Sequence, residues 1–328
     1  MNYYEITKSN LVFLDEKKNE CIDYLMTVIK ENLNKKYKLI FGKYGSHFSG
    51  LSIEGSDIDI CIIYKKLFED GLIFCEELYD ILIKNEKKSN KFSYKTTKIF
   101  KARIPRIIVE IDISEEIKKN KNPLNNSFEY LDNNEMNAIK IDFTFNESEE
   151  YLINNNKSVD FIKNVIKEYP QIKPVILILK RYLKIQKMNE VYLGGIGSYE
   201  LFLMVLNVIK SYQKINPKIP IRISQLLIMT LEKFSFFDFS KKGIGKDNYD
   251  YSLEEKNEEE IPFILNPLTG KNVAQFGSCR GEDIRNTFIK GYNLLYYENN
   301  TFIYYYRVGI YPFNQCSTNS IINLFKMK

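Results

Sequence analysis

Hydrophobic and polar positions follow two different periods along the chain. Apolar residues recur at three- and four-residue steps over residues 12–34, which predicts an amphipathic helix. Short apolar runs rich in β-branched residues predict strands at 37–41, 58–63, 95–113 and 138–145. Helical spacing predicts further helices at 68–85, 158–168, 172–187, 197–213, 222–236 and 281–298. The pattern therefore indicates a strand-rich part near 37–145 with helical segments on both sides.

Three polar segments interrupt this pattern. Residues 42–55 are rich in Gly and Ser, residues 114–137 are rich in Asn, and residues 240–262 carry many charges. Each is predicted to be a loop, and the second has the character of a surface insertion. A chain of 328 residues suggests two domains.

The amino-acid composition excludes several classes of protein. With 44% hydrophobic and 27% charged residues the chain is not of the disordered class. Its five cysteines form no CxxC pair, the N-terminus shows no signal sequence, and no apolar run is long enough to cross a membrane. We therefore expect a soluble, intracellular protein. The net charge of +5 permits a nucleic-acid partner, and the lone His47 makes a Ser-His-Asp triad improbable.

The segment with the most specific chemistry contains two aspartates. Asp57 and Asp59 are separated by one residue at a strand, so both side chains project to one face. Their mutual repulsion is relieved by a cation, and carboxylate oxygens suit Mg²⁺. Gly45 and Ser46 precede them in a Gly-rich turn, where backbone N–H groups can approach phosphate oxygens. The alternative is that this is a surface pair on an edge strand.

The complete string is more informative than the pair alone. Gly45-Ser46, ten further residues, and then Asp57-Ile58-Asp59 within an apolar strand resemble the signature of the DNA polymerase β-like nucleotidyltransferase superfamily. That superfamily has a third carboxylate on a neighbouring strand. Asp112 and Asp142 are both candidates, and their local patterns do not separate them.

Downstream motifs resemble the noncanonical poly(A) polymerase branch, of the TRAMP type with a PAP-associated domain. In that branch the third Asp lies some 35 residues before a lysine. Asp142 precedes Lys180 by 38 residues and Asp112 precedes it by 68, so the resemblance favours Asp142. Residues 114–137 are then an insertion relative to the family.

The same resemblance assigns roles to residues of the helical part. Lys180 and Lys184 lie one helical turn apart and would hold the β- and γ-phosphates, although a solvated basic face is the alternative. Ser198 would contact the triphosphate, and Tyr199 would stack on the base. The run Gly194–Gly197 lacks the context of a dinucleotide fingerprint, and a capped helix start is its ordinary interpretation.

Residues 266–281 resemble the nucleotide-recognition motif of the branch, which implies that Asn272 binds the nucleotide. Two departures are visible, because Asn266 replaces the leading acid and Ala274-Gln275 replaces a Gly-Arg pair. Relatives that transfer uridylyl groups often carry a His in this loop. The only His of the sequence is His47, which lies in the Gly-rich segment of residues 42–55. The lack of a His in the loop of residues 266–281 favours adenine over uracil as the base that is recognised.

The resemblance implies an α+β fold. A nucleotidyltransferase domain with a mixed β-sheet would span residues 37–145, and residues 1–36 and 146–328 would form a helical PAP-associated domain. The active site would lie in the cleft between them. Asp57, Asp59 and Asp142 would bind two Mg²⁺ (or Mn²⁺) ions, and the enzyme would add AMP from ATP to RNA 3′ ends.

The same resemblance implies ligands, a partner and a location, and other functions stay open beside it. It implies ATP and an RNA 3′ end as ligands, an RNA-binding or helicase protein as a partner, no membrane, and a location in the nucleus more than the cytoplasm. Three alternatives stay open: a terminal uridylyltransferase, an inactive scaffold that binds RNA or a partner, and an enzyme acting on a small molecule or protein.

Overall fold

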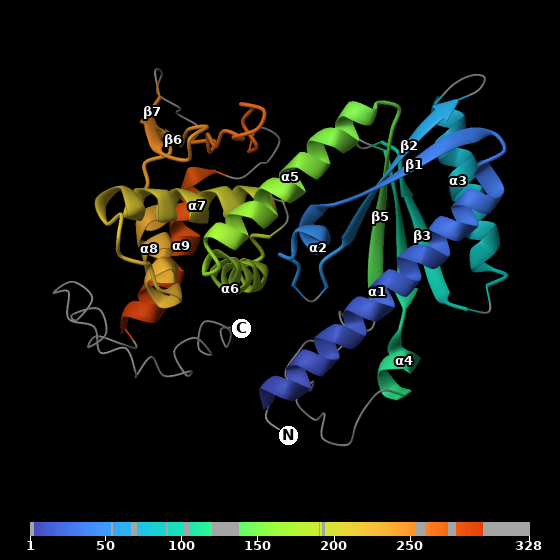
Figure 1. The fold of residues 1–328 in the computed structure, drawn as a ribbon, viewed down its shortest axis with the longest axis horizontal. Coiled ribbons are helices and arrows are strands. Elements are labelled where there is room, and N and C mark those ends of the chain that lie inside the picture. The colour runs from blue at the N-terminus through green and yellow to red at the C-terminus, as the bar shows by residue number, and fades with distance from the viewer. Residues whose placement is uncertain are drawn as a thin grey trace. The chain divides into compact units, whose positions relative to one another are not determined.

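The computed structural model describes residues 3–53, 55–66, 71–89, 91–101, 105–119, 138–189, 191, 194–253, 260–274 and 280–297. The chain divides into two compact units, residues 1–160 and residues 161–328 (Figure 1). The first unit holds a large sheet with helices, and the second is mainly helical.

The first unit is built on a five-stranded mixed sheet. Its strands are β1 (Tyr37–Tyr44), β2 (Ile58–Lys66), β3 (Ser93–Ile99), β4 (Arg106–Asp112) and β5 (Ala138–Asn146). They lie in the order β1-β2-β5-β4-β3. The central pair β2 and β5 is parallel, and every other neighbouring pair is antiparallel. This mixed sheet with its helices confirms the α+β class expected from the sequence.

One face of the sheet carries the main core of this unit. Alternate residues of β2, such as Ile58, Ile60 and Ile62, are fully buried there. They pack with apolar residues of α1 (Tyr3–Leu33) and α3 (Gly71–Glu86). Full burial of each such side chain contributes roughly 1.5–3 kcal/mol to the stability of the fold. This apolar layer therefore stabilises the sheet that carries the aspartates.

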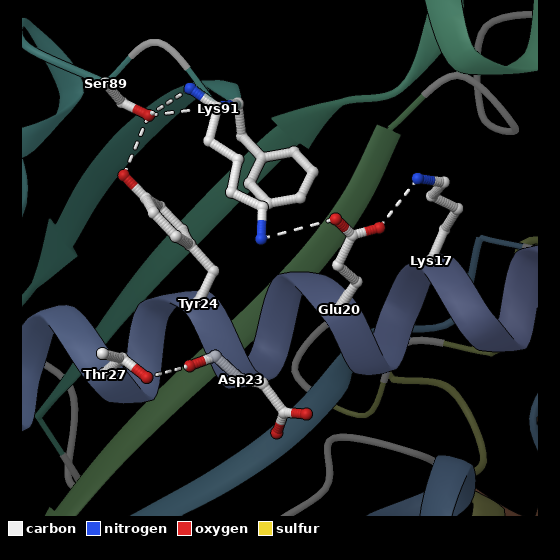
Figure 2. Close-up of polar contacts among 8 residues, drawn as sticks. Lys17, Glu20, Asp23, Tyr24, Thr27, Ser89 and Lys91 are labelled. Atoms are coloured by element: carbon white, nitrogen blue, oxygen red, sulfur yellow. Dashed lines mark hydrogen bonds and ion pairs between the residues drawn. The ribbon is translucent and has the colours of Figure 1, made fainter.

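Helix α1 belongs to this first unit. Its apolar stripe, which includes Leu25 and Ile29, is buried in the core of the sheet. Its polar side also reaches the segment that leads into β3: the Tyr24 hydroxyl donates to Ser89 Oγ at 2.9 Å, and Glu20 lies 3.4 Å from Lys91 (Figure 2). The sequence had grouped residues 1–36 with the helical domain. Periodicity identifies the helix but not the surface that it covers, and here that surface is the sheet.

The start of α5 (Glu149–Glu168) packs on part of the opposite face of the sheet. Leu152 of this helix contacts Cys61 and Ile63 of β2. The helix approaches closely because β1 has a glycine there: a Cβ built on Gly42 would lie 1.7 Å from Leu152 Cδ1. Asp59 precedes Cys61 by two positions, so its side chain projects to this same face.

All three segments expected to be loops contain regular structure. In residues 42–55, β1 continues to Tyr44 and a short helix α2 (Gly45–Ser49) follows. Residues 114–137 begin with α4 (Ser114–Lys119), and residues 120–137 lie outside the described part of the chain. Residues 240–262 include the hairpin of β6 (Lys242–Ile244) and β7 (Asp250–Ser252). Such short elements have too few residues for a periodic pattern to reveal them.

The second unit is a group of packed helices. After the end of α5 come α6 (Ile172–Ile185), α7 (Ser198–Ile215), α8 (Ile223–Ser235) and α9 (Gly281–Tyr297). Helix α7 is its centre, since residues 200–209 are all buried. Helices α6 and α9 are joined by a buried hydrogen bond from the Tyr182 hydroxyl to the Thr287 carbonyl, 2.6 Å long.

Three of the five cysteines lie within the described residues. Cys21, Cys61 and Cys75 are buried free thiols, and burial raises the pKa of the Cys61 and Cys75 thiols to about 11. Cys279 and Cys316 lie outside the described residues. Among the described helices, none combines the length and apolarity that a membrane span requires.

Candidate active site

The turn after β1 brings a glycine against an aspartate. Gly45 has a φ of +77°, in the left-handed region that favours glycine. A Cβ built on Gly45 would lie 1.8 Å from Asp59 Oδ2, so the carboxylate is packed directly on the backbone of the turn. The next residue, Ser46, is half-buried and begins the turn of α2. The Gly-Ser turn and the aspartate strand are therefore in contact.

Strand pairing places a second aspartate beside the first. In the parallel register of β2 and β5, Asp59 stands opposite Asp142. Neighbouring strands lie about 4.8 Å apart, so both carboxylates share one face at short range. Asp57 is exposed and precedes Asp59 by two positions, and its negative charge raises the pKa of Asp142. The structure thus places Asp59 beside Asp142, with Asp57 near enough for its charge to act on Asp142.

Asp142 is the most perturbed of these carboxylates. Only 7% of its side chain is exposed, and burial raises its pKa to about 6. Its Oδ2 pairs with the Arg106 guanidinium at 3.1 Å, which opposes the effect of burial. Its Oδ1 is buried without a hydrogen-bond partner. A buried acceptor left without a partner is costly, and it is common where a ligand completes the site.

Asp112 lies elsewhere on the sheet. The residue of β4 opposite Asp142 is Ile108, so Asp112 is four positions, or about 13 Å, further along the strand. It is exposed and its Oδ1 accepts the Ser114 backbone N–H at 2.8 Å, at the start of α4 (Figure 1). Register therefore separates the two candidates that local sequence could not, and Asp142 is the one beside Asp59.

The arrangement of donors suits a divalent cation. Mg²⁺ usually takes one or two protein carboxylates and completes its shell with water and substrate phosphates. The partnerless Oδ1 of Asp142 is an acceptor that such an ion would satisfy. Among the residues that the structure describes, no three acidic, His or Cys side chains gather closely enough to enclose an ion alone. These residues therefore fit a cation that arrives with a nucleotide.

Sequence reasoning missed three residues of this face. Arg106 pairs with Asp142 from β4, and the Tyr44 hydroxyl lies 2.9 Å from Thr144 Oγ1. Tyr44 stands opposite Asp59 in the antiparallel register, and burial raises its pKa above the ordinary range. Its phenol is therefore neutral beside the carboxylates. The only signal for Arg106 was a lone cation at the start of an apolar strand.

In the second unit, a Gly-Ser turn opens helix α7. Gly197 is the extended residue before the helix, and Ser198 is its first residue. Glu200 Oε2 accepts the Gly197 backbone N–H at 2.8 Å, and burial raises the pKa of this carboxyl to about 7. This contact fixes the backbone of the turn that presents Ser198.

Tyr199 connects this helix to the predicted recognition loop. Its hydroxyl donates to Asn266 Oδ1 at 3.1 Å, and its ring stacks on Phe202 at 6.0 Å between centroids. In the same loop Asn272 Oδ1 accepts the N–H groups of Ile264 and Ala274, and its Nδ2 donates to the Pro262 carbonyl. Asn272 thus shapes the backbone of the loop. Residues 275–279 lie outside the described part.

The two lysines occupy α6 as the spacing predicts. Lys180 and Lys184 are one turn apart, and both are half-buried. Because the two units are separate bodies, the residues of the second unit form one set of candidates and the aspartates of the first unit form another.

Comparison with known proteins finds a family match that lies mainly in the first unit. Residues 25–172 match the family described as Nucleotidyltransferase domain. The inactive noncanonical poly(A) RNA polymerase protein Trf4-2 of Drosophila melanogaster is 26% identical over 242 residues, covering 70% of this chain and 51% of that protein. Poly(A) RNA polymerase protein 1 of Eremothecium gossypii is 23% identical over 271 residues, covering 77% of this chain and 37% of that protein. The chain thus spans about half or less of these relatives.

Solved structures share the fold. The polymerase core of TRAMP, a RNA surveillance complex, superposes with a TM-score of 0.65 at 19% identity, covering 95% of this chain and 88% of that chain. The Cid1 poly(U) polymerase with MgGTP bound gives a TM-score of 0.62 at 18% identity, covering 96% and 94%. Residues 25–172 are therefore similar to the nucleotidyltransferase domain family, and over most of its length the chain is similar to the noncanonical poly(A) RNA polymerases.

Proposed function

We propose that this protein transfers AMP from ATP to the 3′ hydroxyl of RNA without a template. One observation carries the proposal above the others: Asp59 and Asp142 stand in register on parallel strands, with Asp59 packed on Gly45. This is the acidic strand pair beside a Gly-Ser turn that the resemblance to nucleotidyltransferases implies. The poly(A) polymerase relatives supply the choice of RNA as acceptor.

Three carboxylates would hold the metal ions. Asp57, Asp59 and Asp142 would be ligands of two Mg²⁺ or Mn²⁺ ions, which would supply positive charge to acidify the attacking hydroxyl and to neutralise the triphosphate. Arg106 keeps one oxygen of Asp142 paired, so that the other oxygen is presented to the site. The RNA 3′ oxygen then bonds to the α-phosphorus, the bond to the β-phosphate breaks, pyrophosphate leaves, and the hydroxyl proton passes to solvent.

Residues of both units would bind the nucleotide. Ser46 and Ser198 contact phosphate oxygens, and Lys180 and Lys184 add positive charge. Tyr199 stacks on the adenine, since an aromatic ring can stack on a base at a gain of about 1–3 kcal/mol. Asn272 acts through the loop that it shapes.

The choice of adenine rests on the only histidine. His47 is on α2 in the first unit, and residues 260–281 contain none. Uridylyl transfer is the second candidate, because Cid1, a poly(U) polymerase, has the same fold. An inactive scaffold is a third, since one relative is named inactive. The presence of Asp57, Asp59 and Asp142 together argues against it.

The test is primer extension by the purified chain. An oligo(A) primer is incubated with Mg²⁺ or Mn²⁺ and each of the four nucleoside triphosphates separately, and we expect extension to be fastest with ATP. Faster extension with UTP would replace the adenylyl assignment with the uridylyl one. No extension with any nucleotide, under conditions where the protein is folded, would favour the scaffold.

Partners and location follow from the same proposal. A solved structure with the same fold is the polymerase core of a RNA surveillance complex. We propose that an RNA-binding or helicase protein selects the RNA, as a surveillance complex does. A nuclear site of action fits that role better than a cytoplasmic one.

A further inference from the structure

The connection between α7 and α8 exposes large aliphatic side chains. Ile215 ends α7 and is 79% exposed, Ile219 in the connection is 58% exposed, and Ile223 begins α8 and is 46% exposed. Single exposed isoleucines are ordinary, but three within nine residues form a concentrated apolar surface. We name residues 214–223 the α7–α8 corner.

The corner is also strongly positive. Lys214, Lys218 and Arg222 are exposed and alternate with the three isoleucines. Residues 201–231 contain no Asp or Glu. The Lys214 amino group lies 5.3 Å from the ring centre of Tyr249, a residue outside this segment.

The backbone of the corner is fixed. The Asn216 N–H donates to the Tyr212 carbonyl, the Ile219 N–H donates to the Asn216 carbonyl, and the Arg222 N–H donates to Gln225 Oε1. Between them Ile221 is only 6% exposed and anchors the connection in the core. Pro217 and Pro220 restrict the chain further. The exposed side chains thus project from an ordered support, which lowers the entropic cost of binding a partner.

We propose that the α7–α8 corner docks an acidic segment of a partner protein that also carries aliphatic side chains. Acidic residues complement the three cations, and aliphatic residues bury the three isoleucines. RNA fits this surface less well than such a protein segment. Phosphates would pair with the cations and leave the isoleucines in water.

The corner is separate from the residues assigned to the nucleotide. Ile215 and Tyr199 occupy opposite ends of α7, about 24 Å apart at 1.5 Å per residue. A bound segment would therefore leave the Gly197–Tyr199 turn accessible. The inference does not depend on the proposed transfer activity.

The first experiment captures the segment. The full chain carrying a photo-crosslinking benzoyl-phenylalanine at position 219 is irradiated in extract of the cells from which it comes, and the crosslinked peptide is sequenced. The control carries the same group at position 153, since Ile153 is comparably exposed in the first unit. We expect a protein segment rich in Asp, Glu and aliphatic residues, attached at position 219 only.

The second experiment measures binding of that segment as a synthetic peptide. Ile219→Ser and Lys218→Glu should each weaken it about tenfold or more, whereas Ile153→Ser and the exposed-lysine control Lys163→Glu should not. Circular dichroism confirms that each variant is folded. An RNA adduct, a second copy of this chain, a segment without acids, equal capture at position 153, or unchanged affinity in the corner variants would overturn the proposal.

Discussion

The two units of the chain present their polar groups in different ways. In the first, the key carboxylates stand on paired strands, where register and a glycine contact hold Asp59 and Asp142 together. In the second, the candidate groups stand at a helix start and on loops shaped by Glu200 and Asn272. Charge differs as well, since residues 1–160 hold 24 Lys and Arg against 27 Asp and Glu, and residues 161–328 hold 23 against 15.

This difference indicates that the two units have different roles in the proposed reaction. A rigid acidic strand pair suits the chemical step, because small displacements of charge there change the barrier. A basic, loop-bearing helical unit suits binding of the anionic nucleotide and RNA. Substitutions in the first unit should therefore lower kcat, and those in the second should raise KM.

The largest effect should come from the paired aspartates. Asp59→Ala and Asp142→Asn should each lower kcat by about three orders of magnitude or more, because several kcal/mol of charge stabilisation depend on the cation they hold. Asp112→Asn is the matched control and should retain nearly full activity, since Asp112 caps α4 instead. Primer extension at saturating ATP measures this. Loss of activity in Asp112→Asn with retention in Asp142→Asn would reverse the assignment.

The second effect concerns the turn that supports Asp59. Gly45→Ala should lower kcat about 100-fold, because its Cβ would occupy the position of the Asp59 carboxylate. Gly50→Ala is the control, since Gly50 has a similar φ of +76° and tests backbone strain alone. Equal losses in the two variants would mean that strain, and not the position of Asp59, explains the requirement for glycine.

A smaller effect, and of a different kind, is expected in the second unit. Tyr199→Ala should raise KM for ATP about tenfold with kcat little changed, because the stacking surface is lost. Tyr199→Phe keeps the ring and removes only the hydrogen bond to Asn266, so a change of about threefold is expected. Steady-state kinetics separates the two parameters. A fall in kcat at constant KM would contradict the expectation that substitutions in the second unit act on nucleotide binding.

Substitution of Glu200 is expected to have the smallest effect on nucleotidyl transfer. It should instead change how the stability of the folded protein depends on pH. Burial raises the pKa of this carboxyl from 4.5 in the unfolded chain to about 7. The folded state therefore binds the proton more tightly, and its stability is full below pH 4.5 and declines as the pH rises through 7. The loss corresponds to about 3 kcal/mol at most.

Glu200→Gln preserves the acceptor for the Gly197 N–H but cannot ionise. Urea unfolding from pH 5 to pH 8 should therefore show the wild type losing stability relative to Glu200→Gln. Parallel curves for the two proteins would show that this carboxyl does not titrate in the folded state.

The sequence identified site residues where a short motif alone determines which face of a strand they occupy. Asp57 and Asp59 could be identified because a two-residue spacing on a strand puts both on one face. The preference for Asp142 over Asp112 needed the family resemblance, since only the pairing of β5 with β2 and β4 distinguishes them physically. The strands and most helices were likewise expected from the apolar periods, whereas the mixed sheet was expected from the family resemblance.

Features created by distant partners were not predictable. Arg106 meets Asp142 across a strand pair, and its sequence context shows only a cation before an apolar run. Helix α1 was recognised as a helix, but its periodicity does not say that the sheet is the surface it covers. The β6–β7 hairpin is too short for alternation to stand out.

The parallel pairing of β2 with β5 has a consequence for synthesis of the protein. Asp59 and Asp142 are 83 positions apart, and α3, β3 and β4 must be made between them. Such long-range pairing is slow to form and cannot begin before β5 exists. A nascent chain on the ribosome therefore carries no assembled carboxylate pair until residue 146 has left the exit tunnel.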